Sequence, residues 1–197
     1  MMPKISFLLF FLITSQTHAA QKLTMDFVSE KSPVEFLAIG RPAAIKIKGT
    51  GASASGFISW DVKGVSGELI LDLKNFETGL DLRDEHMKEK YLEISKEGYS
   101  KAKLIIKEIS IAQSFFDKDQ EIKDQTFKGI LNLHGVSKEI TGSYSTKFEE
   151  KKSMASGIAD FKIKLSDFTI DIPSFSGITV AEDVNVTVEY LAKVTKN

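Results

Sequence analysis

The residues best suited to acid–base or metal chemistry are two histidines, His86 and His134, and the acidic residues beside the first of them. His86 follows Asp84 and Glu85, whereas His134 precedes Gly135 at the end of an apolar run. A shared metal site would need both imidazoles to meet a carboxylate in space, because protein zinc sites use three or four such ligands. A histidine without these partners is usually a surface or hydrogen-bonded residue, and we interpret both histidines in that way.

Covalent catalysis finds little support in the sequence. The chain has no cysteine, no Gly-x-Ser-x-Gly elbow and no glycine-rich phosphate loop. A site assembled from Asp84, His86 and Ser137 is the weakest hypothesis, so we predict a protein that is not an enzyme and requires no cofactor or metal. We interpret Arg83 and Asp84 as an ion pair whose charges neutralise each other, with contact to a ligand head group as the alternative.

Apolar and polar residues alternate with a period of two through most of the chain, which indicates strands with one face toward a core. Ile58 and Trp60, for example, alternate with Ser59 and Asp61. About nine such stretches at short spacing predict an antiparallel sandwich or barrel. The apolar residues expected to line its interior and contact any ligand there are Phe36, Ile45, Ile47, Ile58, Trp60, Leu69, Leu71, Leu104, Leu131, Leu133, Phe161, Ile163, Val186 and Val188.

Two stretches depart from this alternation. Residues 81–97 carry strong helix formers, and Met87 and Tyr91 are spaced i,i+4, which predicts a short helix with both residues on one face. Residues 116–128 contain several Asp and Lys residues and are predicted to form a polar hairpin loop. In the strand before that loop, the apolar phase shifts after Ile106, as a β-bulge would produce.

Four glycines, Gly56, Gly67, Gly129 and Gly142, fall in phase with the inward apolar residues of their strands. One interpretation is that glycine lets the strands bend sharply at barrel corners. The other is that the missing side chains leave a lumen open for a ligand. Because a small barrel either packs solid or holds one small ligand, both interpretations stay open at this point.

The first residues have the features of a secretion signal. A basic start is followed by an apolar stretch over residues 5–13 and by small residues at Ala19 and Ala20. This order predicts a signal peptide over residues 1–19, cleaved after Ala19 or Ala20, and a single mature domain over 20–197. The apolar stretch is shorter than the ~20 residues of a membrane-spanning helix, so we expect an exported protein with no integral membrane segment.

Composition limits the possible partners. The chain of 197 residues is 42% hydrophobic, which suffices for one domain with a core. Its formal net charge is −1, without a block of like charges. This balance argues against a nucleic acid partner, because binding to nucleic acid needs a concentrated basic face. Since cysteine is absent, the exported fold has to be stable without disulfides.

Several motifs occur in an order that resembles the YceI-like family, the lipocalin-like polyisoprenoid-binding proteins of bacteria. The resemblance covers nearly the whole mature chain. The Thr-Gly…Arg-Asp-x-His-Met group and the Gly-x-Leu-x-Leu-x-Gly-Val-Ser-Lys group are fairly specific in combination. The motifs are Ser32-Pro33-Val34-Glu35-Phe36, Ser66-Gly67-Glu68-Leu69, Phe76-Glu77-Thr78-Gly79, Leu82-Arg83-Asp84-Glu85-His86-Met87, residues 127–138, Leu165-Ser166-Asp167-Phe168 and residues 183–188.

The resemblance implies an all-β fold, an eight-stranded antiparallel lipocalin-like barrel with one short helix near the opening. It also implies a ligand in the lumen, an isoprenoid quinone, a polyprenyl lipid or another long apolar amphiphile, held for carriage or storage. Arg83, Asp84, His86 and Met87 would then lie at the head group or mouth. Members of the family are often periplasmic, which agrees with the leader. We expect a monomer or homodimer, and the alternative function is a packed barrel that acts as a structural or protein-interaction module without a ligand.

Overall fold

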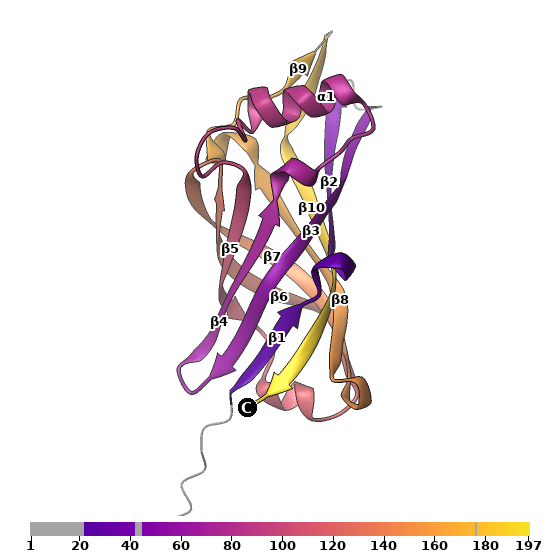
Figure 1. The fold of residues 1–197 in the computed structure, drawn as a ribbon, viewed down its shortest axis with the longest axis vertical. Helices are drawn as coiled ribbons and strands as arrows, with labels where there is room; N and C mark the ends of the chain where they lie inside the picture. The colour runs from indigo at the N-terminus through magenta and orange to yellow at the C-terminus, as the bar shows by residue number, and fades with distance from the viewer. Residues whose placement is uncertain (1–21, 42–44, 176) are drawn as a thin grey trace, which may run out of the picture.

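Eight strands form a closed antiparallel barrel in the described residues of the computed structural model, which are 22–41, 45–175 and 177–197 (Figure 1). The strands are β2 (Pro33–Arg41), β3 (Lys46–Asp61), β4 (Gly64–Asp72), β5 (Lys101–Ile109), β6 (Gln120–Leu133), β7 (Val136–Glu149), β8 (Met154–Lys164) and β10 (Ile178–Lys196). Each pairs with the next, and β10 pairs with both β8 and β2, which closes the ring. The eight-stranded barrel implied by the family resemblance is confirmed. The predicted signal peptide, 1–19, and its cleavage positions lie outside the described residues.

Two short strands and several helical turns complete the barrel. β1 (Leu23–Phe27) pairs with the lower ends of β10 and β3, so that β1 and β2 form one strand interrupted by η1 (Ser29–Lys31) (Figure 1). At the upper end, β9 (Ser174–Phe175) pairs with the start of β10. The remaining short turns are η2 (Leu73–Asn75), η5 (Glu150–Lys152) and η6 (Leu165–Phe168).

A helix crosses the upper end of the barrel (Figure 1). It consists of α1 (Asp81–Glu85) and a π-helical continuation, η3 (His86–Tyr91). The helix predicted over 81–97 is therefore present but shorter. It does not continue because Glu93 and Gly98 adopt φ angles of +48° and +83°, which an α-helix does not allow.

The strands follow the alternation read from the sequence. In β3, Ile58 and Trp60 are buried, whereas Phe57 between them is 42% exposed on the outer face. The pairing of β5 with β6 shifts register between Ile106 and Glu108. This shift is the β-bulge predicted from the change of apolar phase.

The polar hairpin loop predicted over 116–128 is wrong. β6 begins at Gln120, and its polar first half pairs with β7 across a second register shift between Ile122 and Gln125. Both faces of this segment are largely exposed to water, so its side chains show no apolar alternation. Backbone hydrogen bonds to β7 extend the strand there, and a search for apolar alternation cannot detect them.

Aromatic rings fill the lower part of the interior around η4 (Gln113–Asp117), the turn that covers this end of the barrel. Phe116 is 1% exposed, and its ring centroid lies 5.3 Å from that of Trp60 and 5.4 Å from that of Phe148. The Trp60 indole Nε1 donates a hydrogen bond to the Ile111 carbonyl oxygen at 3.2 Å. Trp60 thus points inward as the alternation predicts, into a packed core.

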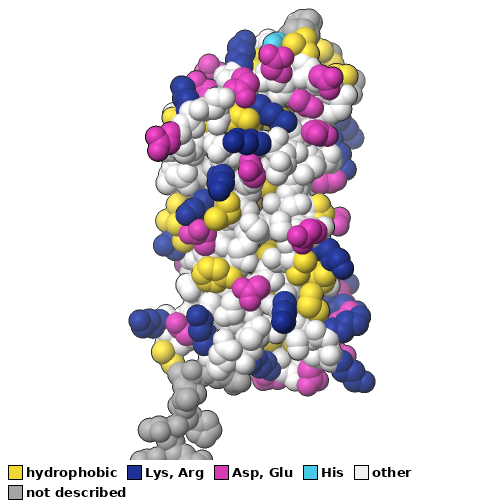
Figure 2. Space-filling view, in the orientation of Figure 1, with side chains coloured by type: hydrophobic (Ala, Val, Ile, Leu, Met, Phe, Trp, Pro, Cys, Tyr) yellow, Lys and Arg dark blue, Asp and Glu magenta, His cyan; other side chains and the backbone are white. Residues whose placement is uncertain are grey.

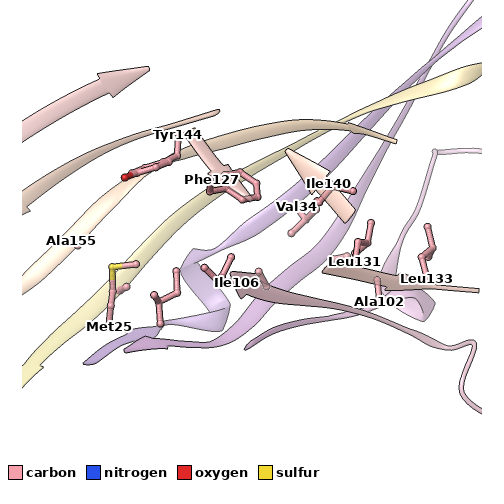
Figure 3. Close-up of a cluster of buried hydrophobic side chains, with 14 of the residues drawn as sticks. Met25, Val34, Ala102, Ile106, Phe127, Leu131, Leu133, Ile140, Tyr144 and Ala155 are labelled. Carbon is pink, nitrogen blue, oxygen red and sulfur yellow. The ribbon is translucent and has the colours of Figure 1, made fainter. Parts of the chain in front are cut away.

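Buried side chains continue upward from this cluster along the barrel. Figure 3 shows part of this core, with Met25 of β1 at the left and Leu131 and Leu133 of β6 at the right. On the outside, charges of both signs are interspersed over the face shown in Figure 2. Exposed ion pairs of this kind contribute about 0–1 kcal/mol each, so the stability of the fold rests on the interior.

The inward-phase glycines make room for backbone in one place and for a ring in another. At Gly56, φ is +128°, and an added Cβ would overlap the Glu68 carbonyl oxygen on the neighbouring strand. Only glycine allows this close approach. At Gly142, an added Cβ would overlap the ring of Phe127. Gly56 agrees with the strand-bending interpretation, whereas the space beside Gly142 is occupied by an aromatic ring and is not left open.

Candidate functional site

The upper half of the barrel encloses a cavity of about 670 Å³, a volume in the range of small-ligand pockets, about 300–1,000 Å³. Inward side chains of β2–β6, β8 and β10 form its wall, together with residues of α1 and η3. The wall residues predicted from the sequence are Phe36, Ile45, Ile47, Leu69, Leu71, Leu104, Leu131, Leu133, Phe161, Ile163, Val186 and Val188. The structure brings them together around one space, and their contact with a ligand stays a prediction.

Ile58 and Trp60, predicted to line the same lumen, do not lie on the cavity wall. They are 4% and 6% exposed and lie further down β3 than Ala54, a wall residue. The alternation assigned them to the correct face of the strand. The interior at their height is filled by the rings around Phe116. The prediction that Ile58 and Trp60 line the cavity is therefore wrong.

Other wall residues were not selected from the sequence. Val184 could have been found, because it continues the alternation of Val186 and Val188. Phe76 lies in an irregular segment after η2 without a periodic signal, and it packs edge-on against Phe36 with ring centroids 5.1 Å apart. The added wall residues include Val34, Ala38, Ala54, Leu73, Phe76, Tyr91, Leu92, Ala102, Ile170, Val180 and Val184.

The cavity reaches the surface at the upper end. Leu80 and Leu82 line it and are also 59% and 54% exposed. Ser174, the first residue of β9, and Pro173 before it line the cavity as well. These four residues define the mouth. The helix crosses the barrel beside this opening, so a chain in the cavity would pass it on the way out.

A hydrogen-bonded network fixes the first turn of the helix. The Arg83 guanidinium donates to the Thr78 hydroxyl oxygen and to the Thr78 carbonyl oxygen, both at 2.6 Å. The Thr78 backbone N–H donates to Asp84 Oδ1 at 2.8 Å, and the Thr78 hydroxyl donates to the same oxygen. The predicted direct ion pair is therefore wrong, because Thr78 lies between the two charges. Neighbouring residues of a helix do not face each other, which explains the difference.

The residues predicted at the mouth differ in whether they line the cavity. Arg83, His86 and Met87 line the cavity, whereas Asp84 does not. Asp84 uses its carboxylate to hold Thr78, and the segment before Thr78 is in turn anchored to β3 by two backbone hydrogen bonds between Glu77 and Thr50, at 2.8 and 2.9 Å. Asp84 thus positions the helix, and the helix in turn places the polar groups of Arg83 and His86 on the cavity wall.

The far end of the helix is fixed to the β9 segment. The Tyr91 hydroxyl accepts a hydrogen bond from the Ser174 backbone N–H at 3.2 Å and donates to the Ser174 carbonyl oxygen at 3.4 Å. The Tyr91 ring and Met87 both line the cavity, so the predicted shared face of these two residues is confirmed. The helix is therefore held at both ends, and its apolar face forms the upper part of the wall.

His134 belongs to a separate cluster at the upper rim. It is 7% exposed, with Nε2 3.0 Å from Glu93 Oε2 and Nδ1 3.1 Å from the Phe168 carbonyl oxygen. The Tyr99 ring packs beside it, with centroids 4.5 Å apart. The hydrogen bond from Lys96 lowers the pKa of the Glu93 carboxyl, against an opposing effect of desolvation and with a smaller lowering by His134. The interpretation of His134 as a hydrogen-bonded residue is confirmed.

Polar chemistry at the cavity is limited. Among residues 22–41, 45–175 and 177–197, no group of three or more His, Asp or Glu side chains is placed to hold a metal ion. Ser137 is exposed on β7, accepts a hydrogen bond from Asn132 Nδ2 at 3.0 Å and is not a wall residue. The described chain also contains no helix with the length and hydropathy that a membrane-spanning segment needs.

A closed barrel that is packed at one end and hollow at the other belongs to the class of small β-barrels with an internal cavity of ligand size. Residues 25–192 match the family model of the YceI-like domain, and the chain belongs to this family. The family resemblance read from the sequence is thereby confirmed. No curated protein matches the chain significantly.

Solved structures share the fold at low sequence identity. A polyisoprenoid binding domain from Saccharophagus degradans, implicated in plant cell wall breakdown, aligns with a TM-score of 0.66 and 16% identity, over 87% of this chain and 98% of that chain. BcnA from Burkholderia cenocepacia aligns with a TM-score of 0.59 and 16% identity, over 83% and 98%. The YCEI protein of Campylobacter jejuni aligns with a TM-score of 0.55 and 19% identity, over 77% and 85%.

Proposed function

We propose that the protein binds one long apolar lipid, an isoprenoid quinone, a polyprenyl lipid or a related amphiphile, for carriage or storage. The observation that carries this proposal is the cavity of about 670 Å³, which is lined almost throughout by aliphatic and aromatic side chains and reaches the surface at the mouth. A structural neighbour is described as a polyisoprenoid binding domain, which supports the same class of ligand. The cavity disfavours the alternative of a packed barrel that acts without a ligand.

Burial of the lipid chain supplies the affinity. Each methylene group removed from water contributes about 0.8 kcal/mol, so ten buried carbons would contribute roughly 8 kcal/mol before the costs of association. A wall of this kind therefore needs few polar contacts. Selectivity then depends on the shape of the cavity and on the groups near the mouth.

Arg83 and His86 are the proposed contacts for a polar head group. Both line the cavity, and Thr78 holds the Arg83 guanidinium in place while accepting two of its five N–H donors. Further donors of the guanidinium would bind a carbonyl or phosphate oxygen of the lipid. Asp84 supports this arrangement by holding Thr78 and is not proposed to touch the ligand.

We also propose that the protein acts by binding, without a catalytic step or a resident cofactor. Of the hypothetical catalytic set Asp84, His86 and Ser137, only His86 lines the cavity. Two findings support this proposal: the chain belongs to the YceI-like family, and one of its structural neighbours is described as a polyisoprenoid binding domain. Incubation of the lipid-loaded protein, followed by mass analysis of the extracted lipid, should return the lipid unchanged. A modified lipid would contradict the proposal.

Export to the periplasm remains part of the proposal and rests on the leader sequence. Cell fractionation should recover the protein in the periplasm, with an N-terminus that begins after Ala19 or Ala20. Retention of the leader in the cytoplasmic fraction would contradict it. The expected state, monomer or homodimer, can be read from the same preparation by its mass in solution.

Native mass spectrometry of the protein purified from its own cells tests the binding function. We expect a discrete additional mass that solvent extraction identifies as an isoprenoid or acyl lipid. A bare chain that also fails to take up added quinone or polyprenol would contradict the proposal. Denatured protein from the same preparation is the control, because a lipid held noncovalently in the cavity is lost on unfolding, whereas a covalent adduct is not.

A further inference from the structure

The cavity ends at a layer of aromatic residues that we call the aromatic floor: Phe127 of β6, Tyr144 of β7 and Tyr190 of β10. They are 5%, 5% and 7% exposed, and none lines the cavity. Each faces inward below the wall, so that Tyr190 follows the wall residue Val188 and Phe127 lies four residues before the wall residue Leu131. Figure 3 shows Phe127 and Tyr144 side by side within the core.

Glycines hold two rings of the aromatic floor in place. Gly142 of β7 receives the Phe127 ring, where an added Cβ would overlap it. Gly157 of β8 receives the Tyr190 ring, where an added Cβ would lie 2.7 Å from Tyr190 Cζ. The Tyr190 hydroxyl also donates a hydrogen bond to the Ser145 carbonyl oxygen at 3.3 Å. Such tight seating leaves these rings little freedom to move aside for a longer ligand.

The interior below the aromatic floor is filled as well. Trp60, Phe116 and Phe148 pack there with centroid distances of 5.3 and 5.4 Å, and Phe115 packs on Phe116 at 5.2 Å. A lipid chain that passed the aromatic floor would have to displace this cluster. The depth of the site is therefore set at the aromatic floor.

The depth can be expressed as a chain length. On β10 the wall extends from Val180 to Val188, and at about 3.3 Å per residue with a strand tilt of about 40° this corresponds to ~20 Å along the barrel axis. A carbon–carbon bond of about 1.5 Å advances an extended chain by about 1.3 Å, so ~20 Å holds about sixteen main-chain carbons, or about four isoprene units.

We propose that the aromatic floor limits the buried part of the lipid chain to about the length of a geranylgeranyl group. This inference rests on the proposed lipid-binding function and adds the chain-length class of the ligand. Longer chains would leave carbons in water beyond the mouth. Because those carbons gain no burial, added length would bring no affinity, and the crowding of the mouth would weaken binding.

The test measures binding of three isoprenoid alcohols, farnesol, geranylgeraniol and solanesol, to the mature protein by native mass spectrometry. We expect geranylgeraniol to bind at least tenfold more tightly than the much longer solanesol, and more tightly than farnesol, which has five fewer carbons to bury. Equal or tighter binding of solanesol would overturn the length limit while leaving the proposed function intact. Binding of none of the three would overturn the proposed function itself, and the length limit with it.

Two variants test whether the aromatic floor sets the limit on chain length. Phe127→Leu removes the ring and extends the cavity downward, and it should reduce the preference for geranylgeraniol over solanesol at least tenfold. Phe148→Leu is the matched control, because it makes the same change in the cluster below the aromatic floor and should leave the preference unchanged. Thermal unfolding confirms that both variants are folded. An unchanged preference in folded Phe127→Leu, or an equal change in Phe148→Leu, would overturn the assignment.

Discussion

The upper and lower halves of the barrel are built from the same strands with the same alternation, yet one is hollow and the other is packed. Below, Trp60, Phe116 and Phe148 fill the interior across the barrel axis. Above, the inward positions of the same strands carry mostly aliphatic residues that cannot reach the centre. The comparison shows that the size of inward side chains and the turn that enters from one end decide whether this barrel holds a ligand.

The largest expected difference between the halves is in stability. Phe116→Ala should lower the free energy of unfolding by about 3–5 kcal/mol, because it creates a cavity in the packed half. Ile163→Ala on the cavity wall should cost less than about 2 kcal/mol, since its side chain already borders open space. Urea denaturation of both variants measures the two values. Equal losses would show that the upper half is packed as tightly as the lower.

Alkaline pH should destabilise the boundary between the halves. Burial raises the pKa of Tyr190 to about 12 from its ordinary value of 10.0 and raises that of Tyr144 as well. Between pH 10 and 12 the unfolded chain releases the Tyr190 proton and the folded chain keeps it, so stability is complete below pH 10 and falls as the pH rises through this window, by about 2–3 kcal/mol for Tyr190 alone. Urea denaturation as a function of pH measures the slope. Tyr190→Phe should flatten it, and an equal slope in that variant would contradict the explanation.

Filling the upper half should weaken ligand binding without loss of stability. Val186→Phe projects a ring into the cavity, and we expect at least a tenfold loss of affinity for geranylgeraniol, which corresponds to about 1.4 kcal/mol. Asn185→Phe is the matched control, because Asn185 is exposed on the outer face of the same strand. Titration by native mass spectrometry compares the two. Equal affinities would show that the ligand lies elsewhere.

The smallest effect is expected at Trp60, which lies below the aromatic floor and outside the cavity wall. Its fluorescence should be that of a buried indole and should change little when geranylgeraniol binds. Phe161→Trp places a second indole on the wall, and this reporter should respond to the same titration. A large response of Trp60 in the unchanged protein would place the ligand deeper than the aromatic floor.

Trp60 also shows what the sequence could predict about this site. A period of two tells which face of a strand a residue occupies, and for Trp60 that prediction is confirmed. Whether the interior at the height of Trp60 is open or filled depends on Phe116, which comes from a turn far away in the sequence. No local pattern reports that contact. The sequence therefore predicted the inward face of the strand correctly, but it also assigned to the cavity wall two residues, Ile58 and Trp60, that lie below the cavity.

The network at the helix illustrates a second limit. Arg83 and Asp84 were correctly selected as a polar pair near the mouth, but adjacency in the sequence suggested a direct contact. In a helix, adjacent side chains diverge, and the short side chain of Thr78 fits between them. The fold class followed from alternation and from the family motifs. The hydrogen-bond partner of Arg83 and Asp84 could not be predicted in this way, because it depends on the path of the loop before the helix.

Strand β10 has a consequence for the order of folding. It is the longest strand of the described chain, with 19 residues, and it pairs with β1, β2, β8 and β9. The contact of β10 with β2 joins segments more than a hundred residues apart, as Val188 with Val34 illustrates, and contacts of such long range slow folding. The ring cannot close before residues 178–196 are available. Until then the chain remains an open sheet with unpaired edges.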